Sequence, residues 1–283
     1  MVLSTVDAYL QLLEIPEGEA RRRAWVTDYE AVHPAVFQTY YSGWGDREQR
    51  DAAADDVTAL AATIRRREAR ATTVVERAGR DLAELGVLDY SDIPTVLMVG
   101  VHTSNGWVTV EGEPTLFLAL ECLPDQPFDE VLTLHEAVHV AQRRLAPSEW
   151  PVSVAARLLL EGVPTAVTRQ LRPGLADSAY LWFDDAHEEW VNECQQREAE
   201  ILPRVVGSLA TEDSPVVSEL FDNKKHTLLP TRCGYWIGEK VAQRLLDGGT
   251  QVGELLRSSY PEALERTKSV LRLLTAERAE DCA

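Results

Sequence analysis

Hydrophobic residues recur at helical spacing along most of this chain. Between residues 52 and 85, apolar side chains return every seven positions, from Val57 through Ile64 to Ala71, while arginines and acids occupy the other faces. That period is typical of an amphipathic helix that packs one face against a core, and the mixed charges indicate a solvated opposite face. The same pattern predicts further helices over residues 4–14, 19–40, 128–145, 152–171, 178–206, 233–247 and 261–279.

The periodicity changes in the middle of the chain, where short β-type runs replace the helical pattern. Runs rich in Val, Leu and Phe occupy residues 94–101, 107–110 and 114–121, with a Ser-Asn-Gly turn after the first. Short polar links between such runs favour antiparallel pairing. We therefore expect an α+β fold that is predominantly helical, with a small antiparallel sheet. A helical N-terminal lobe of residues 1–93 would precede residues 94–283, in one compact unit without internal repeats.

Composition and charge narrow the function classes. The 283 residues include 46 acidic and 28 basic side chains, for a net charge of -18. Such a surface repels phosphate backbones, so nucleic acid is not the expected partner. No segment reaches the ~18 apolar residues that cross a bilayer, and the N-terminus lacks the features of a secretory signal. Four cysteines without a CxxC pair indicate a reducing compartment. We expect a soluble, cytoplasmic protein that binds no membrane, and its oligomeric state stays open.

One segment carries a chemical motif, His135-Glu136-Ala-Val-His139. On a helix the two histidines lie one turn apart on one face, so both imidazoles can bind a single cation. Glu136 is rotated by about 100° from His135, a placement suited to a carboxylate that removes a proton from water beside a metal. The pattern therefore predicts a metal site on the helix of residues 128–145, with Glu136 as the general base.

A catalytic zinc site needs a third protein ligand and an open position. The next predicted helix is strongly apolar, and Glu161 is the one acid within residues 153–168. A carboxylate in a buried helix is costly unless it is paired or bound to a metal, so Glu161 is the expected third ligand. Gly162 would let another backbone approach closely, and Pro164 should bend the helix beside the site. The alternative is an ion pair from Glu161 to Arg157, one turn earlier.

These features together resemble the gluzincin arrangement of metallopeptidases, in which HExxH is followed by an acid on a later helix. More specifically, the chain resembles a group of predicted zinc-dependent proteases with a DUF2268 domain. The resemblance implies a zincin-like fold in which the sheet packs on the HExxH helix, a bound Zn2+, and a hydrolase that cleaves peptide bonds. It covers roughly residues 94–250 and is carried by the strand Leu116–Leu120, the Glu161-Gly162 helix and the segment Gly234-Tyr235-Trp-Ile-Gly238.

The resemblance also implies a side chain that stabilises the oxyanion formed during amide hydrolysis. Gluzincin relatives use a Tyr or His from a downstream helix for this role. Tyr235 lies near the start of the helix predicted at residues 233–247 and is the expected donor, since helix N-termini favour developing negative charge. His226, in the polar segment before that helix, is the second choice.

Two further features are candidates for substrate binding. Arg232, just before the same helix, is placed to bind a substrate carboxylate. The strand that contains Leu116, Leu118 and Leu120 is expected to present an edge to which an extended peptide adds by main-chain hydrogen bonds. The expected ligand is therefore a peptide or small-molecule substrate.

The same three ligands permit two other functions. Two histidines and a carboxylate also form the facial triad of non-haem Fe(II) oxygenases. With Fe2+ and 2-oxoglutarate the protein would be a hydroxylase, and Arg232 or Arg169 would bind the carboxylate of that cofactor. A third alternative is a metal-stabilised binding protein without turnover. The sequence does not identify the metal, so these alternatives stay open beside the zinc peptidase.

Overall fold

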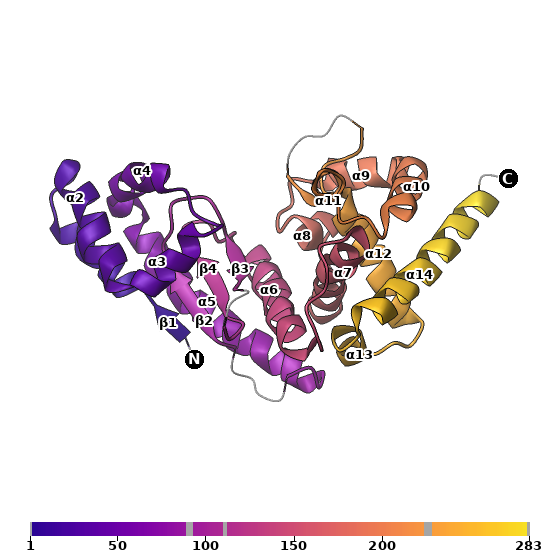
Figure 1. Cartoon of the computed structure of the whole chain (residues 1–283). Helices are drawn as coiled ribbons and strands as arrows, with labels where there is room; N and C mark the ends of the chain where they lie inside the picture. The colour runs from indigo at the N-terminus through magenta and orange to yellow at the C-terminus, as the bar shows by residue number, and fades with distance from the viewer. Residues whose placement is uncertain (1, 89–92, 110–111, 224–227, 282–283) are drawn as a thin grey trace. The chain divides into compact units, whose positions relative to one another are not determined.

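The chain is mostly helical and contains one small sheet (Figure 1). The predicted α+β class is confirmed at this level. Within the described ranges, none of the helices combines the length and the apolar character needed to cross a membrane.

The structure is a computed structural model that describes residues 2–88, 93–109, 112–223 and 228–281. It forms two compact units, the first of Met1–Glu84 with Leu88–Val140 and the second of Leu85–Val87 with Ala141–Ala283. The boundary expected at residue 93 lies inside the first unit.

The sheet belongs to the first unit and consists of β1 (Val2–Ser4), β2 (Thr95–Met98), β3 (Gly106–Val108) and β4 (Leu116–Ala119). Its strand order is β1-β2-β4-β3, with β1, β2 and β4 parallel and β3 antiparallel to β4. The sheet is therefore mixed, which corrects the expected antiparallel sheet. β2 and β4 are buried along their whole length, as is typical of parallel strands, and the chain between them adds β3 on the outside.

Helices cover this sheet, and α5 packs against β2. The helix expected over residues 19–40 is divided, because Pro34 starts a new helix after a π-helical turn and a 3-10 turn. Two aromatic residues of this segment, Trp25 and Tyr29, are fully buried. The α-helices are α1 (Val6–Gln11), α2 (Glu19–Ala24), α3 (Pro34–Tyr41), α4 (Arg50–Asp55), α5 (Val57–Glu84) and α6 (Phe128–Leu145), whose bounds match the prediction.

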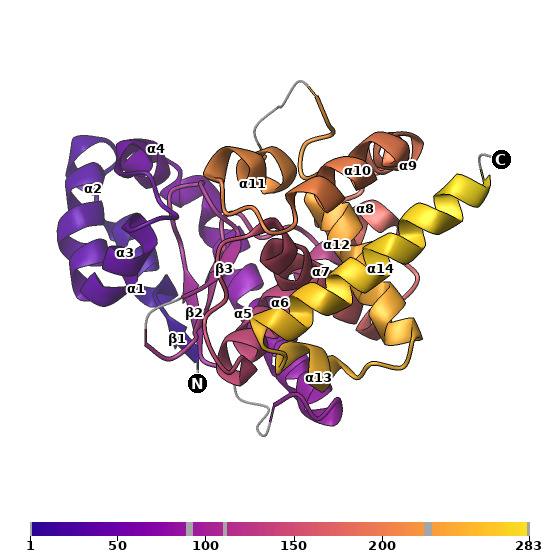
Figure 2. The same cartoon turned by 45° about the vertical axis from the view of Figure 1, so that its right-hand side comes forward.

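The second unit is built around α7 (Val154–Leu171) and α12 (Cys233–Asp247), which pack side by side (Figure 2). The bounds of α12 match the prediction. The helix expected over residues 178–206 is three helices, and the segment between the first two contains a turn in which Asp184 accepts a hydrogen bond from the Ala186 N–H. The other helices are α8 (Asp177–Leu181), α9 (Glu188–Gln196), α10 (Glu198–Ser208), α11 (Ser214–Phe221), α13 (Val252–Leu256) and α14 (Tyr260–Asp281).

A pair of glycines allows α7 and α12 to approach closely. A Cβ atom added at Gly162 would lie 2.1 Å from the Gly238 carbonyl oxygen, and one added at Gly238 would lie 2.4 Å from the Leu158 carbonyl oxygen. No side chain fits at such distances, so the two backbones are in direct contact. The close approach predicted for Gly162 is confirmed, and the partner is α12.

Gly162→Ala should lower the free energy of unfolding by at least about 2 kcal/mol, because the added methyl group forces the two helices apart. Urea denaturation followed by circular dichroism measures the change. Gly207→Ala is the matched control, since nothing lies within 4 Å of a Cβ added at Gly207 in α10. There the alanine should stabilise by up to about 1 kcal/mol. Equal effects of the two substitutions would contradict the close contact.

Candidate metal centre

His135 and His139 lie one turn apart on α6, with ring centroids 4.9 Å apart. The possible ligand atoms of His135, Glu136 and His139 all lie within 4.8 Å of one another. His135 is 2% exposed, whereas Glu136 and His139 are half-buried, so the group is protected on one side and keeps partial access to solvent. Two imidazoles beside a carboxylate suit a divalent transition metal such as zinc or iron. The three residues could therefore hold a metal ion, as the spacing predicts.

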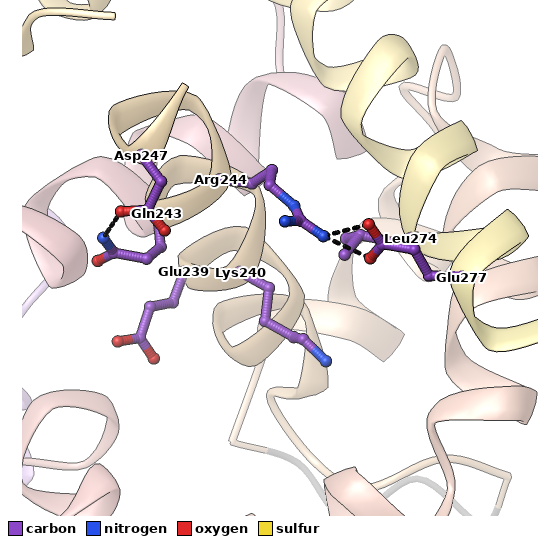
Figure 3. A pocket seen from close by; sticks show the side chains of 7 residues that line it. All are labelled: Glu239, Lys240, Gln243, Arg244, Asp247, Leu274 and Glu277. Atoms are coloured by element: carbon purple, nitrogen blue, oxygen red, sulfur yellow. Dashed lines mark hydrogen bonds and ion pairs between the residues drawn. The ribbon is translucent and has the colours of Figure 1, made fainter. Parts of the chain in front are cut away.

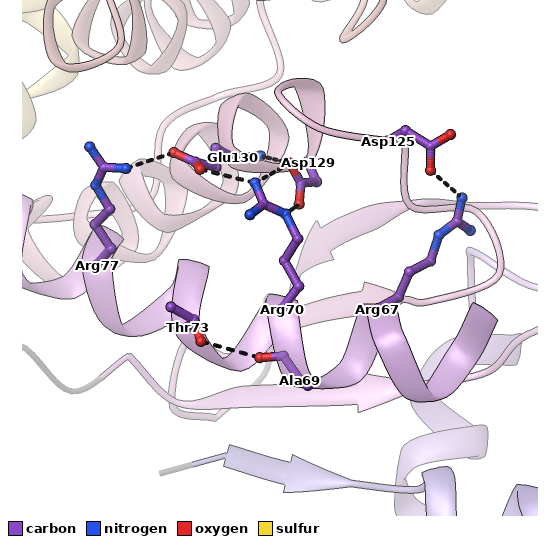
Figure 4. Close-up of polar contacts among 8 residues, drawn as sticks. All are labelled: Arg67, Ala69, Arg70, Thr73, Arg77, Asp125, Asp129 and Glu130. Atoms are coloured by element: carbon purple, nitrogen blue, oxygen red, sulfur yellow. Dashed lines mark hydrogen bonds and ion pairs between the residues drawn. The ribbon is translucent and has the colours of Figure 1, made fainter. Parts of the chain in front are cut away.

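Arginines of α5 bind the first turn of α6 and the segment before it (Figure 4). Arg70 Nη2 lies 3.0 Å from an oxygen of both Asp129 and Glu130, and the hydrogen bond to Asp129 raises the pKa of Arg70. Arg77 Nη1 donates to Glu130 at 3.0 Å, and Arg67 Nη1 donates to two backbone carbonyls that follow β4. These contacts correct the expectation of a solvated helix face. The arginines hold the motif helix against α5.

Strand β3 lies beside Glu136. A Cβ atom added at Gly106 would be 3.3 Å from Glu136 Cγ, so the strand passes within contact distance of the proposed general base. β3 is the outer strand here, whereas β4 pairs with β2 on one side and with β3 on the other. This corrects the expectation for Leu116, Leu118 and Leu120: their strand presents no free edge, because its backbone is paired on both sides. For Gly106 the sequence offered one signal, its place in the Ser-Asn-Gly turn.

Glu161 lies in α7 and is 7% exposed, as expected for the one acid of an apolar helix. Its Oε1 atom lies 3.3 Å from Arg157 Nη1, so the alternative ion pair is present. Gln142 Nε2, near the end of α6, donates to the Leu159 carbonyl oxygen at 3.4 Å. This contact lies within the second unit, to which Gln142 and Leu159 both belong. Since His135 belongs to the first unit and Glu161 to the second, metal binding by Glu161 stays a prediction.

Tyr235 and Arg232 lie together at the start of α12. Arg232 Cζ lies 4.1 Å from the centroid of the Tyr235 ring and 4.4 Å from that of Trp182. Arg232 is 9% exposed, and Tyr235 is half-buried. Both residues belong to the second unit, and their roles beside a metal stay predictions. His226, the second choice as oxyanion donor, lies outside the described residues.

Arg169, the other arginine considered for an anionic cofactor, already has partners. Its Nη1 atom lies 2.8 Å from Asp177 Oδ1, and its Nε atom donates to Glu239. The guanidinium also lies over the ring of Tyr180, 4.2 Å from its centroid. Burial raises the pKa of Glu239, although the hydrogen bond from Arg169 opposes the shift. Arg169 therefore serves to join α7 and α12, because Glu239 lies on α12.

A groove of about 370 Å³ lies between α12 and α14 (Figure 3). Its polar side chains already have partners: Arg244 binds Glu277, Gln243 Nε2 donates to Asp247 at 2.8 Å, Glu239 binds Arg169 and Lys240 binds Glu198. None of the residues predicted for the metal or the substrate lines it. We assign this groove no part in the chemistry of the site.

Comparison with known proteins adds no assignment. No protein-family model, curated protein or solved structure matches this chain. The likeness to zinc-dependent proteases therefore rests on the motif residues, and function has to be argued from their geometry.

Proposed function

We propose that the protein is a zinc-dependent metallopeptidase whose metal is bound by His135, His139 and Glu161. The observation that carries this proposal is the convergence of His135, Glu136 and His139, whose ligand atoms lie within 4.8 Å of one another on one helix. The burial of Glu161, the one acid of an apolar helix, supports it as the third ligand. The position of β3 beside Glu136 supports a zincin-like packing of sheet and helix.

The side chains of the site have separate tasks in this proposal. A zinc ion bound there supplies a Lewis acid, which lowers the pKa of water and polarises a carbonyl oxygen. Glu136 accepts the proton of the attacking water and delivers it to the departing amine nitrogen. The contacts from Arg70 and Arg77 to the first turn of α6 attach that helix to α5 and stabilise the fold around the site.

The outer strand β3 is the proposed docking edge for an extended peptide. The Asn105 carbonyl and the Thr109 N–H bond to β4 at 2.9 and 3.0 Å. Because antiparallel ladders alternate, the Gly106 carbonyl and both backbone groups of Val108 turn away from β4. Gly106 also lies against Glu136, so a peptide paired with β3 would pass beside the general base. Pairing through the main chain would give affinity with little dependence on side chains.

Tyr235 is the proposed oxyanion donor, and its hydroxyl can be removed while the ring stays. Tyr235→Phe should lower kcat with little change in KM, by an amount that corresponds to about 2–4 kcal/mol. The ring contacts with Arg232 and Phe221 remain in the variant, so the melting temperature should stay near that of the wild type. Steady-state kinetics and calorimetry measure both quantities. A destabilised variant with normal specific activity would place the hydroxyl in the folded core instead.

Metal content and two activity assays separate this proposal from its alternatives. Protein purified without added metal is analysed for zinc and iron, and is then assayed for cleavage of unfolded polypeptide and for O2 uptake with 2-oxoglutarate. Zinc together with peptide cleavage supports the peptidase. Iron together with O2 uptake that requires 2-oxoglutarate supports the oxygenase and overturns the proposal. Bound metal without either activity indicates a metal-stabilised binding protein.

A further inference from the structure

We infer that the start of α12 carries a carboxylate-binding site centred on Arg232. The site lies wholly in the second unit, and it does not depend on a bound metal. Its ligand would be an organic acid, either the C-terminal carboxylate of a peptide or a small free acid. Three observations support this assignment: a buried guanidinium with no ion pair or hydrogen bond to any residue that the structure describes, the aromatic rings that cover it, and the helix end at which it lies.

Arg232 is buried without a charged partner. It is 9% exposed, and among the described residues its guanidinium makes no ion pair and no hydrogen bond. Arg21, which is buried to a similar degree, donates instead to the Ile15 carbonyl at 2.9 Å and to the Thr58 hydroxyl at 2.8 Å. A buried charge without a partner is costly, and this chain has 46 acids for 28 bases from which a partner could have come. The missing partner therefore points to a ligand.

Two aromatic rings determine how a ligand can reach this guanidinium. Arg232 Cζ lies over the Trp182 ring and over the Tyr235 ring, 4.4 Å and 4.1 Å from their centroids. Such stacking occupies the faces of the guanidinium, whereas its five N–H donors lie in the plane and point outward. In the part of the chain described, Trp182 Nε1 is sealed from solvent without an acceptor, but no nitrogen of Arg232 is sealed. A planar carboxylate that approaches the open edge can accept two parallel hydrogen bonds.

The helix that begins here favours the same charge. Arg232 is the N-cap residue of α12, which has 15 residues, and its side chain makes no capping hydrogen bond. The dipole of such a helix favours an anion at this end, although two N–H groups of its first turn, those of Cys233 and Tyr235, already donate to the carbonyls of Pro230 and Arg232. A bound carboxylate would therefore interact with the Arg232 edge and with the positive end of α12 together.

Two acids close in sequence to Trp182 have other partners. His187 stacks on Trp182 with centroids 4.1 Å apart, and its Nδ1 atom lies 2.8 Å from an oxygen of Asp184. Glu188 accepts a hydrogen bond from the Ser178 N–H at 3.0 Å. A carboxylate is a better fit than a phosphate, because its plane matches the planar edge of the guanidinium.

Titration calorimetry on the full chain tests the site with paired probes: a short peptide with a free C-terminus, the same peptide amidated, succinate, 2-oxoglutarate and inorganic phosphate. The wild type should bind at least one carboxylate probe, and Arg232→Met should weaken that binding at least about tenfold. Arg232→Lys should lose most of it too, because an ammonium lacks the planar fork. Arg244→Met is the matched control on the same helix, since Arg244 already binds Glu277, and it should bind as the wild type does.

Each outcome decides for or against the site. A preference for the free-acid peptide over its amide, removed by Arg232→Met, supports the site and identifies a peptide C-terminus as the ligand. Binding of succinate or 2-oxoglutarate without binding of the peptide also supports it and identifies a small acid. Carboxylate binding that Arg232→Met leaves unchanged overturns it, as does the tightest binding by phosphate or no binding by any probe. If circular dichroism shows that Arg232→Met is unfolded, Arg232→Lys decides.

Discussion

Glu136→Gln should reduce kcat/KM for peptide cleavage by at least about 10² while the metal content stays near that of the wild type. Glutamine keeps the size and polarity of the side chain but cannot accept the proton of the attacking water. The contact with Gly106 is preserved, because the two side chains have the same length and Cγ lies at the contact. Cleavage kinetics and elemental analysis on one protein preparation measure both quantities.

Glu130→Gln is the matched control for this substitution. It makes the same chemical change on the same helix, but Glu130 binds Arg70 and Arg77 and does not belong to the histidine group. It should cost at most about 1 kcal/mol of stability and leave kcat/KM near wild type. If Glu136→Gln loses the metal, Glu136 is itself a metal ligand. Its carboxylate lies within 4.8 Å of the possible ligand atoms of His135 and His139, so the geometry also permits that role. Full activity with full metal content would contradict its role as a base.

The part of the site that the sequence predicted well is the part that a single helix determines. His135 and His139 are four residues apart, and helical geometry alone brings their rings to 4.9 Å. The bounds of α6 and α12 were predictable for a related reason, since both have a long apolar face and a clear start. No knowledge of the rest of the fold was needed for either.

The surroundings of the motif depend on contacts between distant parts of the chain, and here the prediction was incomplete. Arg70 and Asp129 are 59 residues apart, so nothing in the local pattern of α5 marked its arginines as partners of α6. The order of the strands is equally non-local, because short apolar runs can pair in either direction. For this reason the free edge was expected at Leu118, whereas the structure has it at β3 beside Glu136.

Glu161 shows a third situation, in which spacing permits two interactions that do not exclude each other. Its position one turn after Arg157 predicted an ion pair, and its place on an apolar helix predicted a metal ligand. The ion pair is present at 3.3 Å through Oε1, and a carboxylate has a second oxygen that can bind elsewhere. Only a measurement that removes each interaction separately can assign the function of this acid.

Glu161→Gln should weaken metal binding by more than about 100-fold, whereas Arg157→Met should leave the metal content near wild type. Loss of an outer partner of a ligand already costs about 10–100-fold in affinity, and loss of a charged ligand should cost more. His139→Ala is the positive control, and it should lose the metal as well. Elemental analysis after dialysis against a weak chelator measures all three variants.

The comparison between Glu161→Gln and Arg157→Met is decisive because both substitutions break the same ion pair. Arg157 is about one third exposed, so that pair contributes at most about 1 kcal/mol to stability. If Glu161 served only as the partner of Arg157, both variants would keep their metal. A metal that leaves with Glu161 but stays without Arg157 can only have depended on the carboxylate itself, as a third ligand must.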